Sequence, residues 1–175
     1  MAPTAESRSY DGVLRLFLVF LSWIDRAAGV AVIILMAAMV AVVSSQVFMR
    51  YVLNNSFDWA DETARLCFIW TIFLAIPLAL QRGGHIVMEL LVTRVSARMR
   101  DMLYRAMTVF VIGMMIIIAR EAWRLMLDNW SDTIPSLGWS GGLFFLPIVI
   151  GGIHTTLRLI AILMTGEPHR EGIIE

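Results

Sequence analysis

The sequence contains no lysine and a single cysteine, and charged residues make up only 16% of its 175 residues. The 14 basic residues are all arginine, and 14 acidic residues balance them, so the net charge is zero. A neutral chain has no global field that would attract nucleic acid or another polyanion, which argues against a nucleic-acid-binding protein. One cysteine, Cys67, excludes an intrachain disulfide and a thiolate metal cage.

Apolar residues dominate the composition instead. Hydrophobic residues make up 59% of the chain and the mean hydropathy is +0.77, both well above the balance of a soluble domain. The apolar stretch 13–24 has the length of a signal-peptide core, but Arg15 interrupts it and a longer apolar run follows Asp25. We therefore expect an uncleaved, all-α integral membrane protein that forms one membrane domain over residues 1–175.

Four segments are long enough to cross a bilayer, whose hydrocarbon core of about 30 Å takes roughly 20 apolar residues per helix. The first is free of charge. The second apolar run, 66–80, is short by itself, but Asp58 is a good N-cap and lengthens that helix, while Pro77 predicts a kink near its end. Helix-compatible flanks lengthen the third, and the fourth is long enough by itself. The expected spans are 27–49, 58–81, 102–124 and 142–164.

Two further segments, 11–26 and 85–100, are amphipathic. On a helical wheel each places charged and polar residues on one side and large apolar residues on the other. We expect both helices to lie along the membrane interface. Ten of the 14 arginines fall near the two termini or between the second and third spans. The excess of positive charge on that side predicts that both termini are cytoplasmic.

Polar and aromatic residues gather in the outer link between the first two spans. One interpretation is an interfacial anchor, in which aromatic rings lie at headgroup level and Arg65 pairs with the carboxylates one turn earlier. The other is a contact with a second subunit, since a charge at membrane depth usually has a partner. The candidate interface residues here are Arg50, Tyr51, Trp59, Asp61, Glu62 and Arg65.

Small residues recur at four-residue spacing in two spans. The first span has Ala37, Ala41 and Ser45, and the fourth has Gly151 and Gly152, each followed four residues later by a threonine. Such faces allow two helices to approach closely. The sequence leaves open whether they pack within the four-helix unit or against a helix of another chain.

The spans offer little for chemistry. A proton-coupled carrier would normally carry an acidic residue in the middle of a span, and we assign none, so independent transport is disfavoured. Only His154 lies within a span, and no two of the Cys, His, Asp or Glu residues share a face inside the bilayer by this assignment. We expect no enzyme activity, no catalytic, substrate-binding or metal site, and no cofactor.

Two stretches nevertheless resemble a known family. QVFMRYVLNNSFDWADETARLCFIW (46–70) and LALQRGGHIVMEL (78–90) are similar to the small membrane subunit of tripartite ATP-independent periplasmic (TRAP) transporters, the DctQ-like family. The family often has glutamate in place of Asp61, aspartate in place of Glu89 and glycine near Pro77, and these are mild departures. The resemblance adds Trp70 and His85 to the candidate interface residues.

The resemblance implies a bacterial inner-membrane complex. In such systems a soluble periplasmic protein captures a carboxylate-type solute, and a large membrane subunit moves the solute with sodium in an elevator-like motion. The small subunit is a non-catalytic scaffold held against the large one. An alternative from another class is the small membrane anchor of a redox complex, with haem or quinone bound through His85 or His154. A homo-oligomeric exporter would need the intramembrane carboxylate that we do not assign.

Overall fold

The protein is a bundle of long helices, seen in a computed structural model that describes residues 5–55, 57–81 and 97–165. Four helices are long and apolar enough to cross a membrane, as expected of an all-α membrane protein. In chain order the elements are α1 (Ala5–Val52), α2 (Asp58–Gln81), α4 (Ala97–Asp128), the 3₁₀ turn η1 (Gly141–Phe144) and α5 (Leu146–Thr165).

Helix α1 differs from the expectation of two separate segments, 11–26 and 27–49, because it continues without a break past Arg26. Its 48 residues extend about 72 Å at 1.5 Å per residue, more than twice the thickness of a bilayer core. The chain contains no proline here, and Asp25 turns inward to bind partners on α5. The charged pair at 25–26 therefore does not end the helix. That 11–26 lies along the membrane interface remains a prediction.

The other helices also differ from their expected ranges in detail. Helix α2 covers the same residues as the second expected span. Helix α4 is longer than 102–124 at both ends, and its first residues, 97–100, fall in the expected interfacial segment 85–100, of which 85–96 lie outside the described residues. The span 142–164 is divided into η1 and α5, because Pro147 suits the first turn of a new helix.

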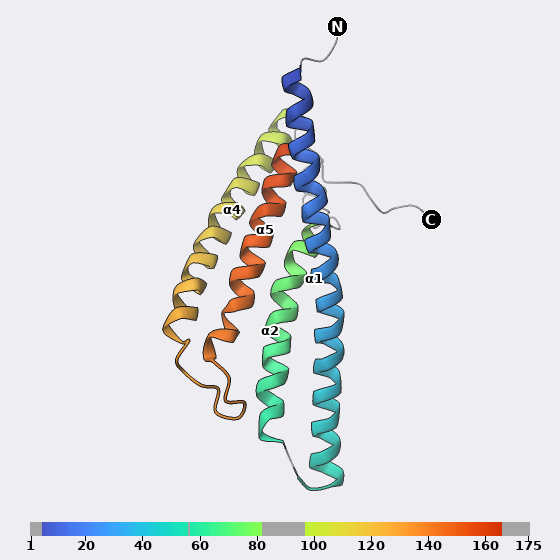
Figure 1. Ribbon diagram of the computed structural model, residues 1–175, viewed down its shortest axis with the longest axis vertical. Helices are drawn as coiled ribbons and strands as arrows, with labels where there is room; N and C mark the ends of the chain where they lie inside the picture. Colours follow the sequence, from blue (N-terminus) through green and yellow to red (C-terminus); the bar gives the residue numbers. More distant parts are fainter. Residues whose placement is uncertain (1–4, 56, 82–96, 166–175) are drawn as a thin grey trace, which may run out of the picture.

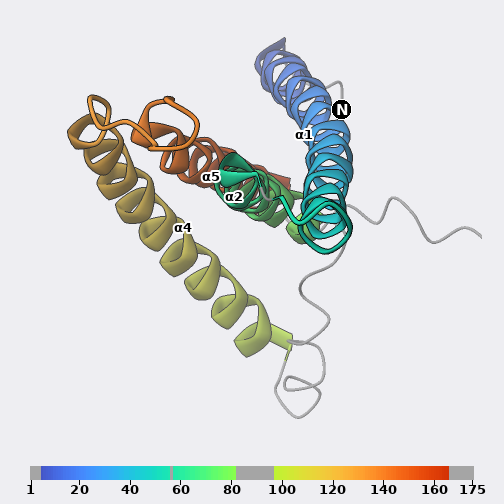
Figure 2. The ribbon, with the colours of Figure 1, turned by 90° about the horizontal axis from the view of Figure 1, so that it is seen from below.

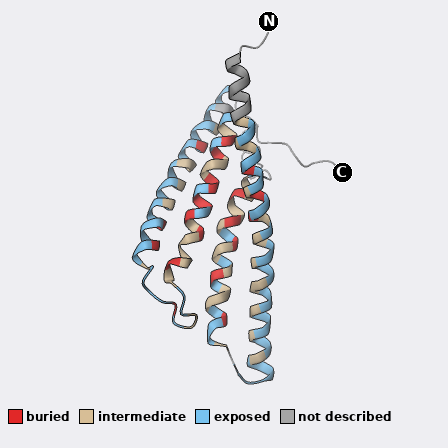
Figure 3. Cartoon of the chain, in the orientation of Figure 1, coloured by how far each residue is buried: buried red, intermediate tan, exposed pale blue. Residues whose placement is uncertain are grey.

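The helices form two hairpins, α1–α2 and α4–α5, which pack against each other through α2 and α5. Figure 1 shows the lateral order α4, α5, α2, α1, and Figure 2 shows α4 and α1 at the two outer positions. In the apolar segment of α5 half of the residues are buried, compared with 6% in the corresponding segments of α1 and α4. Figure 3 shows the same contrast, with buried residues concentrated on α5 and α2. The two outer helices therefore leave broad apolar faces uncovered.

Gly151 and Gly152 set the spacing on both sides of α5. A Cβ on Gly151 would lie 2.4 Å from the carbonyl oxygen of Phe73 on α2, and one on Gly152 would lie 3.1 Å from the Cβ of Ala119 on α4. The glycine pair thus faces α2 with one residue and α4 with the next. Of the two interpretations of these glycines, packing within the chain is the one the structure shows.

The proline of α2 explains why the approach at Gly151 is so close. Pro77 has no backbone N–H, so the carbonyl of Phe73, four residues earlier, lacks the donor that an α-helix normally provides. The glycine hydrogen that replaces a Cβ on Gly151 points at this oxygen, an arrangement typical of weak C–H···O contacts between helices. Pro77 and Gly151 therefore act together at the contact between the two central helices.

Candidate functional site

The candidate residues of the outer link lie where α1 joins α2. Arg50 and Tyr51 are at the end of α1 and are exposed, the tyrosine to 79%. Trp59, in the first turn of α2, is 41% exposed, and its ring centroid lies 5.4 Å from that of Phe57. These side chains form an exposed rim of aromatic and basic groups, which suits an interfacial anchor and a subunit contact alike.

The two carboxylates of this region bind partners from distant parts of the chain. Asp61 Oδ1 accepts a hydrogen bond from Gln46 Nε2 at 3.0 Å, which joins α2 to α1. Glu62 Oε2 accepts a hydrogen bond from the backbone N–H of Ser136 at 3.2 Å and another from its hydroxyl. Within the described residues neither carboxylate forms an ion pair with Arg65, so the pairing expected within one helix turn is not observed.

The contact of Glu62 fastens the loop between α4 and η1 to the bundle. This loop, residues 129–140, is compact: the N–H of Ile134 donates to the carbonyl of Trp139 at 2.7 Å, and the Ile134 side chain is buried. Glu62 accepts the hydrogen bond of the Ser136 backbone N–H near the tip of the loop. We therefore expect the position of the loop to depend on Glu62.

We expect Glu62→Ala to lower the free energy of local opening of this loop by about 1–3 kcal/mol, because a half-buried N–H loses its acceptor. Hydrogen exchange of the backbone amides of residues 129–140, measured on the chain in detergent, would report the change. Glu121→Ala is the matched control, since that carboxylate is 51% exposed and contacts only its own helix neighbour Arg124 among the described residues. Unchanged exchange in the loop of Glu62→Ala would contradict the assignment.

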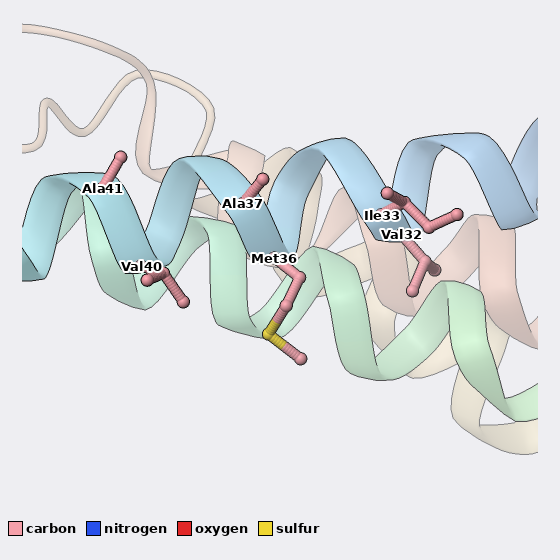
Figure 4. Close-up of a pocket in the computed structure, with 6 residues that line it drawn as sticks. All are labelled: Val32, Ile33, Met36, Ala37, Val40 and Ala41. Carbon is pink, nitrogen blue, oxygen red and sulfur yellow. The ribbon is translucent and has the colours of Figure 1, made fainter.

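The small residues of α1 lie on its uncovered side. Ala37, Ala41 and Ser45 are exposed, and the two alanines point away from α2 in Figure 4. The two alanines belong to an open apolar surface on one side of the helix, which we call the α1 groove. The α1 groove is lined by Val32, Ile33, Met36, Ala37, Val40 and Ala41.

The two other candidate interface residues lie elsewhere. Trp70 is half-buried in α2, and His85 lies outside the described residues.

A buried ionic cluster joins α1 to α5. Asp25 Oδ1 lies 2.9 Å from His154 Nε2 and accepts a hydrogen bond from Arg158 Nε at 3.2 Å, while Oδ2 pairs with Arg158 Nη2. Asp25 is 6% exposed and His154 is 4% exposed. Because a carboxylate can only accept hydrogen bonds, the hydrogen of the short contact with His154 belongs to Nε2. The guanidinium of Arg158 thus neutralises the charge of Asp25, and the imidazole of His154 donates a hydrogen bond to it.

This cluster corrects two expectations from the sequence. Asp25 belongs to the apolar helical segment Leu14–Val52 and contacts His154, which is close to the middle of the segment Gly141–Met164, so an acidic residue does lie at the level of a spanning helix. An aspartate and a histidine therefore meet between two of these helices, and Arg158 binds the same aspartate. The physical reason is the same for both: a charge inside an apolar helix is tolerated when a partner neutralises it.

The sequence contained a signal for this cluster. His154 and Arg158 stand at positions i and i+4, which places them on one face of an apolar helix. A charged arginine on such a face is stable inside the membrane when an acidic side chain lies at the same depth, so the pair predicts an acidic partner. The charges at 25–26 predict a helix end at Asp25, which hides it as that partner. His154 Nε2, which a haem iron would need in the redox alternative, faces this carboxylate instead.

Comparison with known proteins points to one family. Residues 39–166, most of the chain, match the DctQ component of tripartite ATP-independent periplasmic transporters. A Haemophilus influenzae protein with the provisional name TRAP transporter small permease protein is 23% identical over 137 residues, 78% of this chain and 83% of the relative.

Two relatives from Vibrio cholerae carry more specific names. The sialic acid TRAP transporter small permease protein SiaQ is 25% identical over 124 residues, 71% of this chain and 72% of its own. The C4-dicarboxylate TRAP transporter small permease protein DctQ is 24% identical over 104 residues, 59% of this chain and 43% of its own. The four apolar helices agree with a multi-pass protein of the inner membrane. The chain belongs to the DctQ family, the small membrane component of TRAP transporters.

Proposed function

We propose that this chain is a non-catalytic scaffold subunit that binds and stabilises the large membrane subunit of a TRAP-type secondary transporter. One observation carries the proposal: the charged cluster inside the bundle is neutralised within the chain, while the apolar faces of α1 and α4 are left uncovered. TRAP small subunits work with a large membrane subunit and a binding protein. An uncovered apolar face in such a chain suits a helix of the large subunit as its occupant.

The α1 groove is our candidate for that contact. Its residues are apolar, Ile33 is 71% exposed, and Ala37 and Ala41 leave room for the close approach of another helix. The exposed rim of Arg50, Tyr51 and Trp59 would extend the contact to the outer end of α1. Burying such a surface against a second membrane protein gains van der Waals contacts that fluid lipid chains supply less well.

The transported solute is proposed to be an organic acid with a carboxylate group, delivered by a periplasmic binding protein and moved with sodium. The names of the two Vibrio relatives, which refer to sialic acid and to C4-dicarboxylates, support that class. The solute and ion sites would lie in the large subunit, because the buried charges of this chain are already paired with each other.

We further propose that both termini face the cytoplasm, so that the first turns of α1 leave the bilayer on that side. The excess of arginine on this side supports the orientation. Trp23 is 66% exposed, with the guanidinium of Arg26 5.9 Å from its ring centroid. An exposed tryptophan beside an arginine is typical of the part of a membrane helix that passes through the headgroup region.

Uptake by cells that carry all three components tests the proposal. Omission of this chain should reduce the uptake of organic acids, with sialic acid and C4-dicarboxylates among those tested, to background. Ala41→Trp should lower uptake about tenfold, which corresponds to about 1.4 kcal/mol of lost docking affinity. Ile117→Trp is the matched control, since Ile117 on α4 is 62% exposed but lies outside the α1 groove. Full uptake without the chain would contradict the scaffold function, and loss with Ile117→Trp alone would move the contact to α4.

A further inference from the structure

Helix α1 is held to its neighbours by polar side chains at two levels. Near its outer end Gln46 donates to Asp61 on α2, and Asp25 binds His154 and Arg158 on α5. The two levels are about 30 Å apart along a helix that rises 1.5 Å per residue. The α1 groove, residues 32–41, lies between them.

The contact at Asp25 is directional in a way that apolar packing is not. Both carboxylate oxygens are engaged, one by the imidazole and Arg158 Nε and the other by Arg158 Nη2. The planar guanidinium holds the carboxylate in a fork, which defines the direction of the Asp25 side chain. A rotation of α1 about its axis would break this arrangement, whereas apolar side chains could slide past each other.

The cluster also has one favourable charge state. Helix α2 contributes no acidic or basic residue between Leu66 and Leu80, and within the described residues the ionic contacts of the cluster join Asp25, His154 and Arg158. With a neutral imidazole their charges cancel. A proton added to His154 would leave a net positive charge buried among apolar helices, which is costly. We therefore expect the cluster to keep this charge state and to hold α1 and α5 in one relative position.

We infer that the Asp25–His154–Arg158 cluster is a positioning element that sets the rotation of α1 and so aims the α1 groove at the large subunit. Because α1 is one continuous helix, a rotation fixed at residue 25 is carried to residues 32–41. The inference rests on the proposed function, since it supposes that the large subunit occupies the groove. It assigns the three residues a part in assembly although none of them lies on the docking surface.

The test measures helix position and assembly separately. In a Cys67→Ser background, spin labels at Leu16→Cys and Met164→Cys, two exposed sites on α1 and α5, report their distance in the full chain in lipid nanodiscs. The cluster is replaced by apolar residues in Asp25→Leu/His154→Leu/Arg158→Leu. Co-purification of the large subunit with the tagged chain, without spin labels, gives the second readout. Thr108→Val is the matched control, because this buried hydroxyl donates within its own helix, at 2.9 Å to Tyr104 O.

The triple variant should broaden the distance distribution and lower the retained large subunit about tenfold, an effect of the size seen for residues that act on a site without touching it. Thr108→Val should change neither. If the triple variant does not accumulate in the membrane, Arg158→Lys carries the test, since it keeps the charge, loses the fork and should broaden the distances to a smaller degree. An unchanged distance distribution, or broad distances with full retention, would overturn the inference. A wild-type chain that retains no large subunit would instead contradict the proposed function.

Discussion

Replacing Arg158 by leucine is expected to destabilise the chain by about 3–5 kcal/mol, the largest effect of any single substitution considered for the ionic cluster. The variant leaves Asp25 buried at 6% exposure without the guanidinium that neutralises it. Within the part of the chain that the structure describes, Arg158 is the arginine that pairs with this carboxylate. The free energy of unfolding, measured by titration with SDS in mixed micelles, gives the value.

The double variant Asp25→Leu/Arg158→Leu separates two effects of losing Arg158. One is the cost of a buried carboxylate without a cation, and the other is the loss of the net stability that the ion pair contributes. Because both charges are removed, we expect it to be more stable than Arg158→Leu alone. Arg124→Leu is the exposed control: its pair with Glu121 spans 3.4 Å between side chains that are more than half exposed, so the change should stay within about 1 kcal/mol. A double variant as unstable as Arg158→Leu would show that Asp25 does not carry an uncompensated charge in the single variant.

Gly151→Leu is expected to force α2 and α5 apart and to destabilise the chain by about 3 kcal/mol or more, at the upper end of the range for overpacked cores. A Cβ at this position would overlap the carbonyl oxygen of Phe73 at 2.4 Å, and a backbone atom cannot turn aside as a flexible side chain can. Pro77 increases the sensitivity, since it leaves that carbonyl without its helical donor. The same SDS titration measures the loss.

Gly113 provides the matched control on the neighbouring helix α4. A Cβ there would meet no atom within 4 Å, so Gly113→Leu should be neutral or stabilise the helix by about 0.5–1 kcal/mol through its better helix propensity. Equal effects at Gly113 and Gly151 would mean that helix propensity, and not the contact with Phe73, determines the result. A neutral Gly151→Leu would contradict the close packing of the two central helices.

Local signals in the sequence were sufficient for the number of long apolar helices and for most of their extent. The start of α2 follows from Asp58 and Asp61, because carboxylates favour the first turn of a helix whatever the rest of the chain does. The division of the last span likewise has a local cause in Pro147. Features of this kind depend on neighbours in the sequence and can be read from it.

The contacts that define the site depend on residues far apart in the chain. Asp25 and His154 are separated by 129 positions, and Glu62 and Ser136 by 74. A helical wheel of 11–26 places Asp25 on a polar face, which predicts contact with the membrane surface, and only the packing of α1 on α5 shows that this residue turns inward. The predicted break at Asp25 and Arg26 is wrong for the same reason, since a charge bound by a tertiary partner does not end a helix.

Exposure separates the two sets of small residues in the spans. Their spacing fits packing within the chain and packing against a helix of another chain equally well, and Ala37, Ala41 and Ser45 are exposed on α1 in the isolated chain. Gly151 and Gly152, which have the same four-residue spacing to a small residue, instead pack against α2 and α4 within the chain. A small-residue pattern predicts close packing but does not name the partner, because the spacing is the same for both.

The most direct test of the scaffold function is the native mass of the tagged chain, extracted in mild detergent from membranes that also contain the large TRAP subunit of the same bacterium. We expect a complex that contains both the chain and the large subunit, which the α1 groove variant Ala41→Trp weakens. A wild-type chain that runs alone, or only with copies of itself, would contradict it.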